Sequence, residues 1–426
     1  MTLSPNAKEI VLSLIKKNKS KADYFDVRVG DSSGTYININ NHKIDDVSKP
    51  KSFGGSVRVL HKGGWGTVTF NDVVNLEDSF DEALLFAKRT GNSKSVLAKA
   101  PVVVDKVTVP DVKKAFTKIS LKDKVDVFKK YDRLAWSKGK KLVNVEIYYS
   151  DSLRSKLFAS SEGSLIEVEE AYVSARIMVT AKSGTTIELY SDKLTDLSFA
   201  DVLGKEDLVI NAVKTAEKIS EAPNVKSGTY DVVMDPALSG VFAHEAFGHL
   251  SEGDNAYENP QIANLMKLGT RFGSDILNIS DDPTIPNQRG SYKYDDEGVT
   301  SRQAKLLENG ILVGRLHSRE TAGKMNEKPT GHARAESVFK FPLVRMGITY
   351  IKPGKSNFDD MIKSINENMG TTMVIVTHDL DLIFNIAHRV IMLDKEEKGI
   401  IAEGNPRELQ KNSSDVRVHN FFNRKC

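Results

Sequence analysis

The sequence has almost no cysteine and no long apolar run. Its 426 residues include a single cysteine, Cys426, at the final position. One cysteine excludes an internal disulfide framework and is typical of a protein from a reducing compartment. No apolar stretch approaches the roughly eighteen residues that a membrane-spanning helix needs, and the first residues lack the apolar core of a signal peptide. We therefore expect a cytoplasmic protein with no membrane partner.

Net charge is also low. The formal net charge is +3, and charged residues make up 27% of the chain. A charge this small gives no argument for nucleic acid as a direct partner. The hydrophobic share of 40% is ordinary for a globular protein. The length predicts two or three domains, each able to bury a core of its own.

Two of the nine histidines lie close together. Residues 244–254 read His-Glu-Ala-Phe-Gly-His-Leu-Ser-Glu-Gly-Asp. Zinc prefers imidazole nitrogens as ligands, and a carboxylate beside the metal can accept a proton from a bound water molecule. The sequence therefore predicts that His244 and His249 bind a metal ion and that Glu245 is the catalytic base. The alternative is a chance grouping of polar side chains on one face of a helix.

The spacing of these histidines differs from that of a regular helical zinc site. They are five residues apart, which separates them by about 140° around an ideal α-helix, whereas a spacing of four gives about 40°. A π-type turn would bring both to one face, and Gly248 lowers the resistance to that distortion. Asp235 followed by Pro236 is typical of a helix start. We therefore predict a helix from Asp235 to about Leu250 with a π-bulge at residues 244–249.

Hydrophobic periodicity divides the chain into an α+β protein of two regions and a tail. Residues 1–220 mix helical and alternating patterns, which predicts an N-terminal α/β domain with a mixed sheet. Residues 229–365 predict a second, β-rich domain that carries the metal-binding helix. The expected elements of these regions, besides that helix, are helices at 5–17, 76–88, 120–134 and 206–219 and strands at 26–29, 35–39, 56–60, 67–70, 143–149, 171–179 and 230–234.

Two acidic segments follow the histidine motif. They are Ser280–Pro283 and the run Asp295-Asp296-Glu297-Gly298. Aspartate, glycine and proline in such short runs are typical of turns. We interpret the carboxylates of both segments as solvated turn residues rather than as metal ligands.

Taken together, these motifs resemble those of a known family. Phe53–Val59 with Gly64-Trp65-Gly66 is similar to the glycine-and-arginine signature of the TldD/PmbA metallopeptidases. Residues 244–254 are similar to the family's His-Glu-x-x-x-His-x-x-Glu-Gly-Asp motif. Asp295–Gly298, Thr330-Gly331 and Pro353-Gly354 follow in the family's order. The resemblance extends from Ala22 to Ile365.

The resemblance implies a peptidase that depends on zinc and cleaves small or unfolded peptides in extended form. It implies His244 and His249 as zinc ligands and Glu245 as the general base. It also implies a dimer, either a homodimer or a heterodimer with a related PmbA-like subunit. The family has been labelled a modulator of DNA gyrase, but no basic, aromatic-interleaved segment here supports direct contact with DNA. The alternative is a non-catalytic partner subunit in which the same fold serves dimerisation.

Residues 366–426 do not continue this resemblance. The family's last stretch contributes a cysteine as third zinc ligand, and we do not assign that role to Cys426. Residues 368–381 are instead similar to the end of an ABC-transporter ATPase, with an apolar strand at Met373–Thr377 and His378 in the place of its switch histidine. A helix at 382–387, a hairpin of 390–393 with 400–402, and a helix opened by Pro406 complete an expected βαββ fragment.

ATP binding is therefore a third hypothesis, and the sequence argues against it. An ATPase needs a glycine-rich phosphate loop with its lysine. Gly354-Lys355-Ser356 imitates the end of such a loop, but Thr349 stands where the pattern requires glycine. We therefore expect a chimeric chain whose junction near residues 365–370 removes the end of the metallopeptidase domain and impairs its activity.

Overall fold

The computed structural model describes residues 5–91, 94–195, 198–229, 232, 234–357, 360–361, 380–394, 397 and 399–423. The chain divides into two units, Met1–Lys352 and Pro353–Cys426. Within the described ranges, no helix is both long enough and apolar enough to cross a lipid bilayer. The domain ranges expected from the sequence stay predictions.

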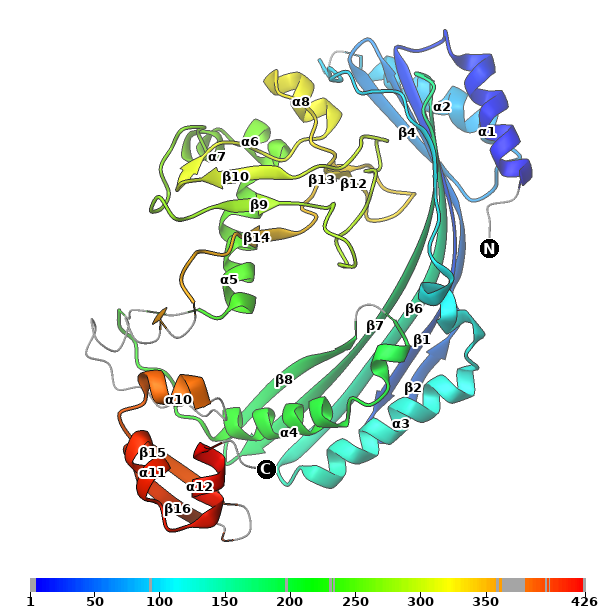
Figure 1. Ribbon diagram of the computed structural model, residues 1–426. Coiled ribbons are helices and arrows are strands. Elements are labelled where there is room, and N and C mark those ends of the chain that lie inside the picture. The colour runs from blue at the N-terminus through cyan, green and yellow to red at the C-terminus, as the bar shows by residue number, and fades with distance from the viewer. Residues whose placement is uncertain are drawn as a thin grey trace. The chain divides into compact units, whose positions relative to one another are not determined.

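An eight-stranded sheet forms the N-terminal part of the first unit (Figure 1). Its strands follow the order β4-β3-β1-β6-β7-β5, with β2 paired to β1 and β8 paired to β7. All of these pairings are antiparallel except β5 with β7, so the sheet is mixed. The strands are β1 (Tyr24–Asn40), β2 (Lys43–Ser48), β3 (Lys51–His61), β4 (Gly64–Phe70), β5 (Val104–Val107), β6 (Leu142–Ser160), β7 (Leu165–Ser183) and β8 (Thr186–Thr195).

The two strands expected at 26–29 and 35–39 are one continuous strand, β1. The intervening residues Gly30–Gly34 have the composition of a turn, but they pair with β3 on one side and β6 on the other. Backbone pairing with two neighbours therefore overrides the local turn preference.

Helices pack against both ends of the long strands (Figure 1). At one end, α1 (Pro5–Asn18) and α2 (Leu76–Arg89) bury a core with β1 and β3. At the other end, α3 (Leu121–Lys138) and α4 (Glu206–Glu221) bury a second core with β6 and β7. The side chain of Ser120 accepts a hydrogen bond from the backbone N–H of Asp123 at the start of α3, as its capping pattern predicts. These helices confirm the predicted positions.

The rest of the first unit combines short helices with two small sheets. One has the order β11-β10-β9-β14, and the other pairs β12 with β13. The mixed α+β class predicted from the sequence is confirmed. The elements are α5 (Pro236–Ala243), α6 (Gly253–Glu258), α7 (Pro260–Leu265), β9 (Ile279–Asp281), β10 (Ala304–Glu308), β11 (Ile311–Leu312), α8 (Arg319–Met325), β12 (Ala333–Arg334), β13 (Leu343–Val344) and β14 (Thr349–Ile351).

The acidic segments after the histidine motif are buried, so their interpretation as solvated turns is wrong. Asp281, Asp295 and Glu297 are all at most 6% exposed. Asp281 accepts hydrogen bonds from His332 and from the backbone of Gly347, at 3.0 and 2.9 Å. Burial alone raises the pKa of Asp281, but the hydrogen bond and charge of His332 outweigh it and lower the pKa. Such carboxylates tie loops together inside the fold.

The second unit is built on the predicted hairpin. β15 (Val390–Asp394) pairs with β16 (Gly399–Gly404), and α10 (Leu380–Ile386), α11 (Pro406–Asn412) and α12 (Val416–Phe422) pack with it. The helix opened by Pro406 is confirmed, with Asn405 as its N-cap. The expected strand Met373–Thr377, His378 and Cys426 lie outside the described residues, as does most of the expected strand at 230–234.

Candidate metal centre

The helix predicted for the histidine motif is present and changes its pitch at the motif. Asp235 caps α5 by accepting a hydrogen bond of 2.7 Å from the backbone N–H of Leu238. The helix continues as a π turn over His244–Gly248 and a 3₁₀ turn over His249–Ser251. The N–H of His249 donates to the carbonyl oxygen of His244, a five-residue step. The predicted π-bulge is confirmed.

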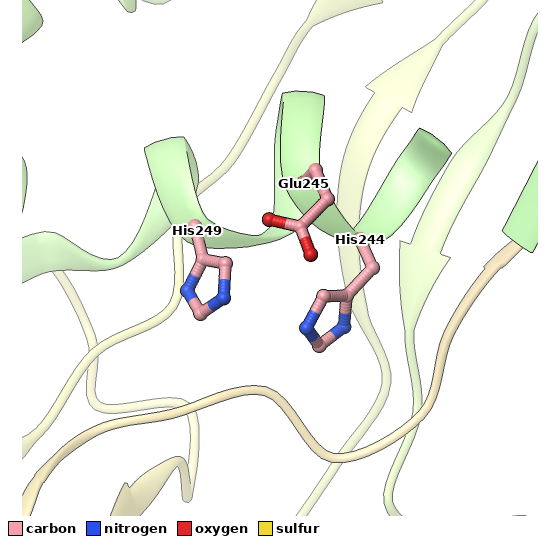
Figure 2. Close-up of side chains that lie close together, drawn as sticks. All are labelled: His244, Glu245 and His249. Carbon is pink, nitrogen blue, oxygen red and sulfur yellow. The ribbon is translucent and has the colours of Figure 1, made fainter. Parts of the chain in front are cut away.

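The π turn brings the two imidazoles to one side of the helix (Figure 2). The ring centroids of His244 and His249 are 4.8 Å apart, with the ring planes at 78°. The carboxylate of Glu245 lies with them, and one ligand atom from each of the three residues falls within 4.8 Å of the others. Both histidines are half-buried and Glu245 is exposed, so the group faces accessible space. A regular helix would point the two rings apart.

The opposite side of the same turn is anchored in the core. Ala243 and Phe247 are buried, and Phe247 contacts Phe272 edge to face at 5.7 Å between ring centroids. Gly248 passes so close to Met346 that a Cβ atom there would lie 1.9 Å from the Met346 sulfur. The core contacts therefore fix the rotation of the turn, and the close approach explains why position 248 is glycine.

A buried carboxylate holds the second histidine. Oε1 of Glu252 lies 3.2 Å from Nδ1 of His249, and Glu252 is 1% exposed. Oε2 of Glu252 accepts hydrogen bonds from Asn255 and Arg345, at 3.3 and 3.2 Å. Burial raises the pKa of Glu252 to about 7, although the charge of Arg345 opposes the increase. This contact occupies Nδ1 of His249 and leaves Nε2 as the ring nitrogen that can bind a metal ion.

These supporting residues were not identified from the sequence. Glu252 is part of the quoted motif, but the pattern alone gave it no role. Arg345 is 93 residues further along the chain, and its place beside the motif depends on the fold. The sequence holds one local indication of this contact. Glu252 is three residues after His249 on a helical segment, and residues at that spacing lie on the same face of a helix.

The donor set fits a transition-metal ion, and zinc in particular. Two imidazole nitrogens are ligands typical of zinc. In zinc sites, a carboxyl group commonly contacts the ring nitrogen of a ligating histidine that does not bind the metal. Among the residues that the structure describes, no fourth histidine, cysteine, aspartate or glutamate joins the group. His244, Glu245 and His249 are thus brought together as predicted, while their roles stay predictions.

The histidines open onto a cleft of about 960 Å³. One wall is formed by the large sheet, with residues of β1, β6 and β7, and the other by residues 334–346. A hydrogen bond joins these walls, because Arg28 of β1 donates to the carbonyl oxygen of Lys340 at 2.5 Å. Outside the cleft lining, Arg58 of β3 lies 3.4 Å from Glu297. The cleft therefore lies within the first unit, and contacts inside that unit hold its walls.

Family comparisons agree with this combination of fold and site. Three protein-family models match the chain: PmbA/TldA metallopeptidase domain 1 over residues 25–87, the central domain over 114–221 and the C-terminal domain over 227–413. A metalloprotease of Synechocystis is 38% identical, in a match covering 84% of this chain and 77% of that protein. The chain therefore belongs to the PmbA/TldD metallopeptidase family.

Two further relatives extend the comparison. A zinc metalloprotease TldD homolog of Saccharolobus solfataricus is 30% identical, over 74% of this chain and 69% of that protein. A crystal structure from Thermotoga maritima, described as a candidate modulator of a DNA gyrase, superimposes with a TM-score of 0.69 and 23% identity. That match covers 84% of this chain and 80% of the other, and at this identity it supports the fold alone.

The comparisons correct the interpretation of the C-terminal tail. The C-terminal domain model extends to residue 413, well beyond Ile365. The expectation that the resemblance stops there, with the end of the domain lost, is therefore wrong. No comparison supports a likeness of residues 366–426 to an ABC-transporter ATPase. A strand, a helix and a hairpin occur in many α/β proteins, so local similarity of this kind is not specific.

Proposed function

We propose that this chain is a zinc-dependent peptidase that hydrolyses small or unfolded peptides. The observation that carries the proposal is the π turn, which holds two imidazoles with ring centroids 4.8 Å apart beside a free carboxylate. The Saccharolobus relative is named a zinc metalloprotease, which supports zinc as the metal. The 960 Å³ cleft that adjoins both histidines offers room for a peptide segment.

In this proposal each residue of the motif has one role. His244 and His249 bind zinc through ring nitrogens, and Glu252 keeps the ring of His249 in position. Zinc held by these residues would supply Lewis acidity, which lowers the pKa of a water molecule toward about 7 and polarises a peptide carbonyl group. Glu245 accepts the proton of the attacking water at a carboxylate oxygen and passes it to the departing amine.

The cleft then selects peptides that can be extended. A folded protein could not place its backbone between the large sheet and residues 334–346, because contacts such as the hydrogen bond from Arg28 to Lys340 hold the two walls together. A flexible peptide enters without that restriction. This is the physical reason to expect short or unfolded substrates.

The test separates metal binding from chemistry. Wild-type protein is expected to contain zinc and to cleave unstructured peptides. Glu245→Gln should retain zinc but lose roughly 10²- to 10⁴-fold in kcat, since it removes the base without removing a ligand. His249→Ala should lose zinc as well.

The control for this test is Glu258→Gln, which changes an exposed carboxylate at the end of α6. It should match the wild type in zinc content, measured by mass spectrometry, and in cleavage, measured by chromatography. Equal cleavage by the wild type and Glu245→Gln would refute the role of Glu245. Absence of any metal-dependent cleavage by the wild type would instead favour a non-catalytic partner subunit.

We further propose that the chain works as a dimer, with itself or with a related PmbA-like subunit. The support is an exposed apolar surface on α5, where Leu238, Val241 and Phe242 are each at least 50% exposed. Light scattering of the purified protein, alone and mixed with a candidate subunit, measures the assembly. A cytoplasmic location stays a prediction.

A further inference from the structure

A second cavity opens beside the cleft that holds the histidines. It has a volume of about 270 Å³, and it shares wall residues with the cleft, among them Tyr172, Tyr292 and Val338. Because these residues line both spaces, the smaller cavity lies directly beside the cleft. We call it the side-chain pocket and define it by Val29, Val107, Leu157, Phe158, Ile166, Val168, Tyr172, Tyr292 and Val338.

The floor of the side-chain pocket is apolar and belongs to the large sheet. Phe158 of β6 and Ile166 of β7, which pair with each other, are at most 7% exposed. Val107 of β5 pairs directly with Val168 of β7, and both valines line the pocket. An apolar group that enters therefore contacts side chains already held by strand pairing on a rigid sheet.

Two lysines that line the pocket, Lys156 and Lys293, are paired with carboxylates. Lys156 lies 3.1 Å from Glu170 and 4.0 Å from Asp296. Elsewhere on the wall, Lys293 pairs with Asp105 at 2.7 Å. Charges that are already paired gain little from a charged ligand, and separating them would leave partly buried charges without partners.

Aromatic rings stand where the pocket meets the cleft. The guanidinium of Arg154 lies 4.9 Å from the ring centroid of Tyr172, and that of Arg334 lies 4.7 Å from the ring centroid of Tyr292. The hydroxyl of Tyr292 also donates to the carbonyl oxygen of Gly331 at 3.0 Å. These contacts fix both rings, which can then pack against an entering ring.

We propose that the side-chain pocket is a specificity subsite that takes one large apolar side chain of the peptide substrate, preferably an aromatic one. This inference rests on the proposed peptidase function, because the occupant must belong to a peptide lying in the cleft. A cavity of about 150 Å³ can hold benzene, so the 270 Å³ of the side-chain pocket has room for a phenyl or indole group. Burial of such a group should tighten binding roughly tenfold to a hundredfold.

The first experiment measures binding without cleavage. Fluorophore-labelled ten-residue Gly/Ser peptides that carry one Phe, one Asp or neither are titrated into Glu245→Gln protein and followed by anisotropy. The Phe peptide should bind roughly tenfold to a hundredfold more tightly than the other two. With wild-type protein, the cut should fall at a fixed number of residues from Phe as Phe is moved along the peptide.

Two matched valine variants locate the effect. Val107→Trp fills the pocket and should remove the Phe preference. Val104→Trp makes the same change on the same strand, at a residue that is 73% exposed and lines neither cavity, and should preserve it. Val107→Ala adds no bulk, and it should shift the preference from Phe toward Trp. Melting temperature and zinc content confirm that each variant is folded.

The outcomes distinguish the subsite from the proposed hydrolysis. Cleavage with no preference for Phe, or an equal loss in Val107→Trp and Val104→Trp, overturns the subsite and leaves the peptidase in place. Phe-selective binding without any cleavage supports the subsite and overturns the hydrolysis. Failure to bind any of the peptides overturns both.

Discussion

The orientation of His249 depends on a carboxylate three residues further along the chain. Glu252 contacts Nδ1 of the imidazole at 3.2 Å and is itself held by Asn255 and Arg345. A ligand ring fixed in this way loses little rotational freedom on binding a metal. The helix positions the ring, and Glu252 selects the nitrogen that faces the cleft.

Removing the charge of Glu252 should therefore weaken metal binding without removing a ligand. Glu252→Gln is expected to lower zinc affinity roughly tenfold to a hundredfold, measured by competition with a chromophoric chelator. The cobalt-substituted protein should show a changed visible spectrum, because the geometry of His249 changes. Glu258→Gln removes an exposed carboxylate further along the same segment and should leave both measurements unchanged. Equal affinities for the two variants would contradict the contact's role.

At the scale of a single element, the π turn determines the site. The five-residue step from His244 to His249 aligns rings that a regular helix would separate. On the far side, Gly248 contacts Met346 closely enough that no side chain fits without displacement. The same turn thus serves the metal site on one face and the core on the other.

A double-mutant cycle tests this packing. Gly248→Ala should lower the free energy of unfolding by about 1–3 kcal/mol, because the new methyl group overlaps the buried Met346 side chain. In a Met346→Ala background the same change should cause no loss, since Ala is favoured over Gly in a helix by up to about 1 kcal/mol. Urea denaturation measures both.

Gly240→Ala is the matched control for this cycle. Gly240 lies on α5, and a Cβ there would meet no atom within 4 Å. It should not destabilise the protein in either background. A loss at Gly240 as large as that at Gly248 would mean that helix distortion, and not contact with Met346, sets the cost.

The element scale also separates what the sequence could predict from what it could not. The π turn followed from histidine spacing, because five residues and a shared metal ion leave few helical geometries. The helices starting at Ser120 and Asp235 followed from local caps. By contrast, the burial of Asp281 depends on donors in His332 and Gly347, more than fifty residues away. The residues that neighbour Asp281 in the sequence do not indicate which distant residues will form hydrogen bonds with it.

On the scale of the whole first unit, an ion pair between distant segments joins the large sheet to the region that carries the histidines. Arg58 of β3 is fully buried, and Nη2 donates to Asp26 of β1 at 2.6 Å. Nη1 lies 3.4 Å from Glu297, in the loop before β10, and the guanidinium stacks 4.8 Å from the ring centroid of Phe341. Burial alone lowers the pKa of Arg58, but Asp26 and Glu297 outweigh it and raise the pKa. The charge therefore stays in place and joins the sheet to the site-bearing region.

Loss of this arginine should destabilise the unit far more than loss of a surface cation. Arg58→Met leaves Asp26 and Glu297 buried without their shared partner, which costs about 3–5 kcal/mol. Lys130→Met, which breaks an ion pair with Glu206 whose side chains are 62% and 36% exposed, should cost about 0–1 kcal/mol. Urea denaturation of both variants gives the comparison. Equal losses of unfolding free energy in the two variants would mean that the buried ion pairs of Arg58 stabilise the protein no more than a surface ion pair does. If Arg58→Met alone loses most of its stability, the sheet and the region that carries the histidines depend on one another to fold.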